Sequence, residues 1–143
     1  MVGEVGDDIA TMAEGLIAGA SVTFLGVRDD VRDLLSQADV MVFPSIREGL
    51  PGVVLEALFE GTPVVAVDLP GAQFIQEQVP AAPLLPLPKD ADPEQWADQT
   101  LALLATAPRR VETRGLMERS IFSLSQSADA LGRVYGLGTP RRV

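Results

Sequence analysis

The chain has 143 residues, of which 47% are hydrophobic and 22% are charged, and this length and composition predict one globular domain with a substantial core. The 20 Asp and Glu against 11 Lys and Arg give a net charge of −9, so no broad basic surface for nucleic acid is expected. The sequence has no Cys and no His, which excludes disulfides, thiol catalysis and a Ser-His-Asp triad.

No apolar run in the sequence reaches the roughly 20 residues that a membrane-spanning helix requires. The N-terminal stretch 1–12 also lacks the basic segment of a signal peptide. The sequence therefore predicts a cytoplasmic protein, for which any membrane contact would come only through a longer full-length protein.

Three short β-branched segments recur along the chain, and each is separated from the next by one helix length. They are VTFLG at 22–26, VMVFP at 40–44 and PVVAV at 63–67. The segments between them, 29–38 and 51–60, suit helices, because the first opens on acidic residues and the second begins near a proline and ends before a glycine. This alternation predicts an α/β fold, a Rossmann-like parallel sheet flanked by helices.

The rest of the chain begins with a proline-rich connection at 79–94. Its prolines forbid a helix and allow at most a short edge strand in PLLPL at 83–87. Further helices are predicted at 93–107 and in the tail through Tyr135. We assign residues 1–136 to the single domain and 137–143 to a frayed tail.

Ligands of open parallel sheets bind beyond the carboxyl ends of the strands. The loops 26–30, 44–52 and 67–71 follow the three predicted strands. We therefore expect all three loops to lie along one edge of the sheet, where they would form the functional face.

Two glutamates near the second loop are candidate ligand-binding residues. Glu48 lies in the loop, and Glu56 lies about one turn into a helix whose other residues are nearly all apolar, so the helix is expected to be packed on every side. A buried carboxylate needs a hydrogen-bonding partner, and the hydroxyls of a sugar or ribose would serve. The alternative is that Glu48 is solvated and Glu56 pairs with a core arginine. Glu60, at the end of this helix, is predicted to be solvent-exposed and to have no functional role.

The same loop leads into a helix start that suits an anion. Gly49 and Gly52 keep the backbone open to close approach. The free N–H groups and the positive dipole end of the helix that follows would favour a diphosphate.

The run FPSIREGLPGVVLEALFEGTPVVAVDLPG at 43–71 resembles the donor-binding half of retaining, metal-independent glycosyltransferases of the GT-B fold, of the family-four type. Two glutamates with seven residues between them, then Ala and Gly-x-Pro-Val-Val, are that family's most specific motif. The segments 22–45, 1–8 and 119–136 are similar to the family as well. The resemblance implies a C-terminal GT-B half that lacks its first strand and helix.

The resemblance also implies roles for individual residues. Glu48 would face the transferred sugar as the catalytic residue, and Glu56 would bind the ribose hydroxyls of a nucleotide-sugar. The remaining donor contacts would come from the loop and helix start, Gly49, Leu50, Pro51, Gly52 and Val53, and from the base-binding loop Gly26, Val27 and Arg28. The donor is a nucleotide-diphosphate-sugar, and neither a cofactor nor a metal is expected.

The chain departs from the family pattern in three respects. The family has an Arg and Lys pair, which neutralises the leaving diphosphate, just upstream of the segment that corresponds to residue 1, and an N-terminal acceptor domain before it; we expect this chain to lack both. Ala72 and Gln73 stand where the family shows a second Gly and a Glu. We therefore expect the whole enzyme to transfer a sugar and this chain alone to be inactive. One alternative is a non-catalytic nucleotide-sugar-binding or regulatory fragment. Another is a nucleotide-sugar epimerase of the same fold, but an epimerase needs acid and base groups, and the absence of His and the short length argue against it.

Overall fold

The computed structural model describes residues 22–136 of the chain. The chain divides into two compact units, Met1–Leu34 and Leu35–Val143. The tail 137–143 and the segment 1–8, for which predictions were made above, lie outside the described residues.

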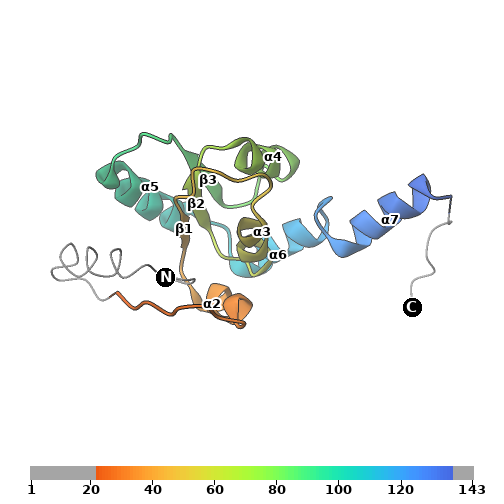
Figure 1. Ribbon diagram of the computed structural model, residues 1–143, viewed down its shortest axis with the longest axis horizontal. Helices are drawn as coiled ribbons and strands as arrows, with labels where there is room; N and C mark the ends of the chain where they lie inside the picture. Colours follow the sequence, from red (N-terminus) through yellow and green to blue (C-terminus); the bar gives the residue numbers. More distant parts are fainter. Residues whose placement is uncertain (1–21, 137–143) are drawn as a thin grey trace. The chain divides into compact units, whose positions relative to one another are not determined.

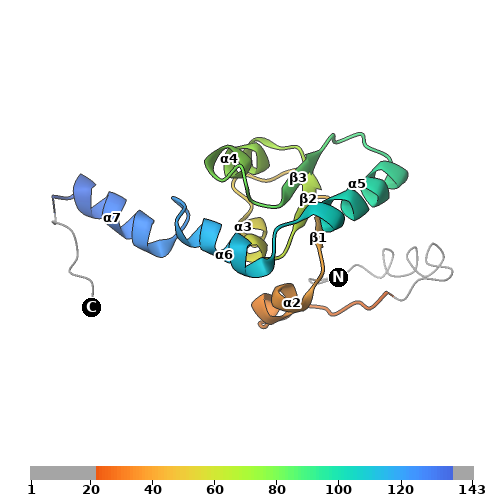
Figure 2. The same ribbon diagram turned by 180° about the vertical axis from the view of Figure 1, so that it is seen from behind.

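A three-stranded parallel sheet lies at the centre of the second unit (Figures 1 and 2). Its strands are β1 (Met41–Phe43), β2 (Val64–Val67) and β3 (Leu84–Leu87), in the order β1-β2-β3. Val65 of the middle strand is level with a residue on each side, Val42 in β1 and Leu85 in β3. All three carboxyl ends therefore point to the same edge of the sheet.

The observed strands confirm two of the three main strand predictions, those at 40–44 and 63–67. Every residue of β2 is buried, as expected for a valine-rich strand that is covered on both faces. The short edge strand predicted in PLLPL also forms. Pro86 lies within it, and an edge strand tolerates proline because one side of its backbone needs no ladder partner.

Residues 22–26 form no strand, so that prediction is wrong. A β-branched segment becomes a strand only where a neighbouring strand pairs with its N–H and C=O groups. This segment belongs to the first unit, and the described part of that unit, residues 22–34, contains no strand that could pair with it.

The helices include those predicted and one that was not. Pro93 opens a predicted helix whose N-cap, Asp92, forms a reciprocal capping box with Gln95. The helix that begins at Pro70 was not predicted. No helix among residues 22–136 is long and apolar enough to cross a membrane. The described helices are α2 (Val31–Gln37), α3 (Gly52–Phe59), α4 (Pro70–Gln78), α5 (Pro93–Thr106), α6 (Arg110–Glu118) and α7 (Leu124–Val134).

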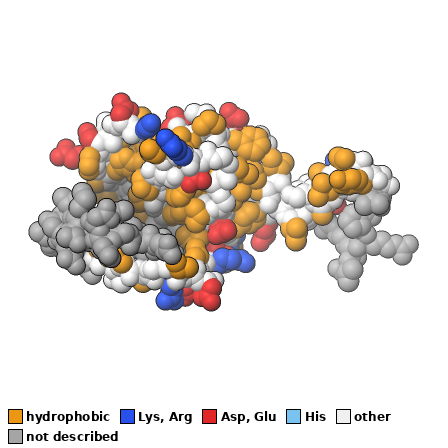
Figure 3. All heavy atoms as spheres, in the orientation of Figure 1, with side chains coloured by type: hydrophobic (Ala, Val, Ile, Leu, Met, Phe, Trp, Pro, Cys, Tyr) orange, Lys and Arg blue, Asp and Glu red, His pale blue; other side chains and the backbone are white. Residues whose placement is uncertain are grey.

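The hydrophobic core of the second unit is centred on α3 and β2. Val54, Ala57 and Leu58 of α3 are fully buried, and α3 packs against both β2 and α6. Ile75 of α4 and Met117 of α6 are also fully buried. The space-filling view shows hydrophobic side chains gathered over this body, with few basic side chains among them (Figure 3). Helix α3 is thereby fixed by packing along one face.

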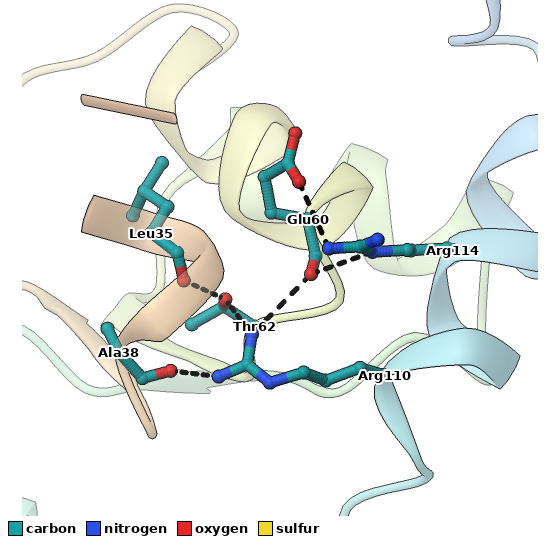
Figure 4. Close-up of polar contacts among 6 residues, drawn as sticks. All are labelled: Leu35, Ala38, Glu60, Thr62, Arg110 and Arg114. Atoms are coloured by element: carbon teal, nitrogen blue, oxygen red, sulfur yellow. Dashed lines mark hydrogen bonds and ion pairs between the residues drawn. The ribbon is translucent and has the colours of Figure 1, made fainter. Parts of the chain in front are cut away.

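The connection from α3 to β2 is held by an arginine of α6 (Figure 4). Arg110 donates to Thr62 Oγ1 at 2.8 Å and to the carbonyl oxygen of Ala38. Thr62 Oγ1 in turn donates to the carbonyl oxygen of Leu35 at 2.5 Å. Gly61 permits this close approach, because it has a φ of +77° and a Cβ there would lie 2.6 Å from the carbonyl oxygen of Arg110. One guanidinium thus ties together three segments that are far apart in sequence.

Glu60 is buried, so the prediction that solvent surrounds it is wrong. Arg114 Nη2 lies 3.2 Å from Glu60 Oε2. Arg114 Nε also donates to the backbone carbonyl oxygen of Glu60 at 3.0 Å. This carbonyl lies at the C-terminal end of α3, where a positive charge is favourable. The partner is 54 residues away in the sequence, a separation that local patterns do not reveal.

Thr113 of α6 is fully buried, and its hydroxyl makes no hydrogen bond within the described part of the chain. An unpaired buried hydroxyl destabilises the folded state, and valine has nearly the same shape without it. We expect Thr113→Val to raise the free energy of unfolding by about 1 kcal/mol, as measured by urea denaturation. Thr100→Val is the control, because the Thr100 hydroxyl donates to the carbonyl oxygen of Trp96 at 2.6 Å. Equal effects of the two substitutions would contradict this prediction.

Candidate functional site

Two loops meet beyond the carboxyl ends of β1 and β2. One loop, 44–51, leads from β1 into α3, and the other leads from β2 into α4. Gly71, the second residue of α4, lies so close to the first loop that a Cβ on it would be 1.8 Å from the carbonyl oxygen of Gly49. The two loops therefore lie side by side, as predicted. The third predicted loop, 26–30, belongs to the first unit.

Glu48 is exposed in the loop before α3, and a neighbouring hydroxyl holds its carboxylate. Ser45 Oγ donates to Glu48 Oε1 at 2.8 Å. Within residues 22–136 no partner is found for Glu48 Oε2. One carboxylate oxygen is thus oriented by the protein, while the other is open to a ligand.

The N-terminus of α3 is uncapped. Its N-cap residue is Pro51, which provides no side-chain hydrogen bond, and the amides of Gly52 and Val53 donate to no other described residue. A Cβ on Gly49 or Gly52 would meet no atom within 4 Å. The helix start therefore offers free N–H groups, a positive dipole end and an open approach, which together suit an anion.

Glu56 is exposed, so the expectation that its helix is packed on every side is wrong. Helix α3 buries Val54, Ala57 and Leu58 on one face only. Gly52 and Glu56 are four residues apart, so they lie one above the other on the exposed face. The proposed pairing with a core arginine is also absent among the described ion pairs. The Glu56 carboxylate instead lies on the same face as the open backbone of Gly52.

The loop of the first unit that was predicted to receive a nucleotide base contains an internal ion pair. Arg28 Nε donates to Asp30 Oδ1 at 2.7 Å. This side-chain hydrogen bond lowers the pKa of Asp30 and raises the pKa of Arg28. Gly26 has a φ of +66°, a left-handed conformation that glycine adopts readily. The role of Gly26, Val27 and Arg28 as a base-binding loop stays a prediction.

Two features of the site were not predicted from the sequence. The first is α4, whose start was signalled by Pro70 at the first helical position. The second is the contact of Gly71 with the neighbouring loop, for which the sequence offers no signal except the glycine itself. Residues 22–136 contain no group of three or more His, Cys, Asp or Glu that could hold a metal ion.

Comparison with known families identifies the class of protein to which this fold and site belong. Residues 1–106 match the family model described as glycosyl transferases group 1. The chain belongs to this family, as its resemblance at 43–71 predicted.

Curated relatives cover most of this chain, but the chain covers only part of them. The D-inositol 3-phosphate glycosyltransferase of Mycolicibacterium vanbaalenii is 32% identical over 133 residues, which are 91% of this chain and 29% of that protein. The protein EpsF of Bacillus subtilis is 32% identical over 126 residues, which are 85% of this chain and 31% of that protein. The chain thus spans less than a third of the length of either relative.

Solved structures confirm the fold. WaaG, a glycosyltransferase involved in lipopolysaccharide biosynthesis, has a TM-score of 0.71 at 24% identity, over 94% of this chain and 37% of its own. AviGT4, a glycosyltransferase involved in avilamycin A biosynthesis, has a TM-score of 0.66 at 21% identity, over 94% of this chain and 41% of its own. The α/β class and the C-terminal half of a GT-B fold are therefore established.

Proposed function

We propose that this chain is the donor-binding half of a glycosyltransferase that transfers a sugar from a nucleoside-diphosphate sugar to an acceptor. The observation that carries the proposal is the uncapped start of α3 with an exposed glutamate on each side of it. Glu48 precedes the helix, and Glu56 lies on the same exposed face as Gly52. Free N–H groups suit a diphosphate, and carboxylates suit sugar hydroxyls.

Each residue has a distinct part in this proposal. The amides of Gly52 and Val53 hold the diphosphate, and Glu56 binds the ribose hydroxyls. Glu48, oriented by Ser45, faces the transferred sugar, whose anomeric carbon becomes cationic as the diphosphate leaves. A carboxylate at that position gains interaction energy as the reaction proceeds. The backbone of Gly49, Leu50 and Pro51 lies against the sugar and phosphate, while loop 26–28 receives the base.

The proposal includes three further features of the reaction. The reaction retains the anomeric configuration of the transferred sugar and needs no metal ion. The reaction also requires the acceptor-binding domain that the family places before this half. In this proposal the isolated 143-residue chain binds the donor without catalysis.

The test is a transfer assay that compares the complete glycosyltransferase with the isolated 143-residue chain. Each is supplied with labelled UDP-glucose, GDP-mannose or ADP-glucose and a panel of acceptors, with and without EDTA. We expect transfer by the complete enzyme alone, unaffected by EDTA, with retained anomeric configuration in the product as measured by NMR. Transfer by the isolated chain would refute its inactivity, and the absence of transfer by the complete enzyme with every donor would refute the proposed function.

A further inference from the structure

Position 71 requires a glycine because the neighbouring loop leaves no room for a Cβ atom. The φ of Gly71 is not positive, so an alanine could adopt its backbone conformation. A Cβ at this position, however, would lie 1.8 Å from the carbonyl oxygen of Gly49 and 2.9 Å from Pro51 Cδ. The atoms in the way belong to a backbone and a proline ring, which cannot rotate aside as the end of a long side chain could.

Of the two elements that meet at Gly71, α4 is the more firmly held. Ile75 and Ala72 of α4 are buried in the core, and the helix start is fixed by a hydrogen bond from the amide of Asp68 to the carbonyl oxygen of Leu87 at 2.7 Å. The side chain of Gln73 also donates to Asp68 Oδ1 at 2.9 Å. The start of α4 is therefore a rigid support.

The loop that rests on this support is held by few other contacts. Residues 46–50 are exposed and make no backbone hydrogen bonds to other described residues. The side chain of Glu48 is bonded to Ser45 within the same loop, which ties the loop to itself and not to the sheet. The backbone of Gly49 and the ring of Pro51 do, however, lie directly against Gly71 at the start of α4.

We propose that Gly71 is a positioning residue of the donor site, which acts through Gly49 and Pro51. By allowing α4 to touch the loop, it places Glu48 and the first amides of α3 where a nucleoside-diphosphate sugar can meet both. This inference rests on the proposed function. It goes beyond that function because it assigns a role to Gly71, a residue to which the proposed function gives none.

The test is Gly71→Ala in the 143-residue chain. An added Cβ needs at least 3.0 Å of clearance, so the loop must move by about 1 Å, and misplacements of that size have large effects on catalytic sites. In the ligand-free protein we expect the amide NMR signals of residues 48–53 to shift. We also expect the affinity for UDP-glucose, GDP-mannose or ADP-glucose, whichever the wild-type chain binds most tightly by calorimetry, to fall by about tenfold or more.

Two control variants separate positioning from a loss of stability. Ala72→Gly weakens the start of α4 but adds no atom against the loop, so it should lower the unfolding temperature and leave donor affinity intact. Gly115→Ala adds a Cβ whose nearest neighbour is the guanidinium end of Arg119, at 3.2 Å, and should not change affinity. Equal losses of affinity in Gly71→Ala and Ala72→Gly would overturn the inference.

The outcomes distinguish this inference from the proposed function. Unshifted loop signals in Gly71→Ala, or an unchanged donor affinity, would overturn the role of Gly71 alone. A wild-type chain that binds none of the three nucleotide-sugars would overturn donor binding by this chain, even where the loop signals of Gly71→Ala do shift.

Discussion

Arg110→Met should lower the free energy of unfolding by about 3 kcal/mol, because hydrogen bonds from a charged group contribute roughly 1.5 to 3 kcal/mol each. The guanidinium of Arg110 donates to Thr62 Oγ1 and to the carbonyl oxygen of Ala38, and methionine keeps an unbranched apolar stem without these donors. The substitution leaves partly buried acceptors unpaired at the junction of three segments. Urea denaturation of the wild-type and variant proteins measures the change, and the dependence of the free energy of unfolding on urea concentration should be the same for both.

Arg109 provides the matched control for this prediction. It is the preceding residue, its side chain is 80% exposed, and its guanidinium pairs with Glu112. Exposed ion pairs of this kind contribute little to stability, so Arg109→Met should change the free energy of unfolding by less than about 1 kcal/mol. If the two substitutions were equally destabilising, the network around Arg110 would not have the structural role described above.

Glu48→Gln should lower kcat of the complete glycosyltransferase by about 100-fold, the size of effect that follows when one group stabilising transition-state charge is removed. Glutamine keeps the shape and can still accept a hydrogen bond from Ser45, so the fold and the loop should be preserved. The substitution removes only the negative charge that we propose to lie beside the departing sugar. Steady-state kinetics at saturating acceptor give kcat and the donor KM separately.

Glu56→Gln in the same enzyme should act differently. In the role proposed for Glu56 its contacts with the ribose do not change during transfer, so the donor KM should rise by about tenfold while kcat is nearly retained. Glu118→Gln, an exposed substitution at the end of α6, serves as the control for loss of charge. An unchanged kcat in Glu48→Gln, or an unchanged donor KM in Glu56→Gln, would remove the proposed role from that residue.

The sequence alone predicted the elements whose patterns are local. The valine-rich run at 63–67 and the proline and glycine that bracket α3 are signals within a few residues, and β2 and α3 form where they predict. The segment 22–26 carries the same kind of pattern. It forms no strand, because a strand depends on a neighbour that a local pattern does not reveal.

The site was predicted only in outline for the same reason. Glu48, Glu56 and the uncapped helix start were all identified, but the burial of Glu56 and of Glu60 was misjudged. Glu56 has apolar neighbours in sequence, yet an eight-residue helix on a sheet buries one face and leaves the other exposed. Glu60 is buried because Arg114, far along the chain, reaches it. Contacts between distant segments decided both outcomes.

The most direct test of the account is amide chemical-shift mapping of the 143-residue chain titrated with UDP-glucose, GDP-mannose and ADP-glucose. If this chain is a donor-binding half, the largest shifts should fall on the amides around the start of α3, those of Gly49, Leu50, Gly52 and Val53, and on Glu56 one turn further. The amides of α6 and α7 should be nearly unchanged. Saturable shifts confined to α6 and α7, or no saturable shift with any of the three nucleotide-sugars, would contradict the account.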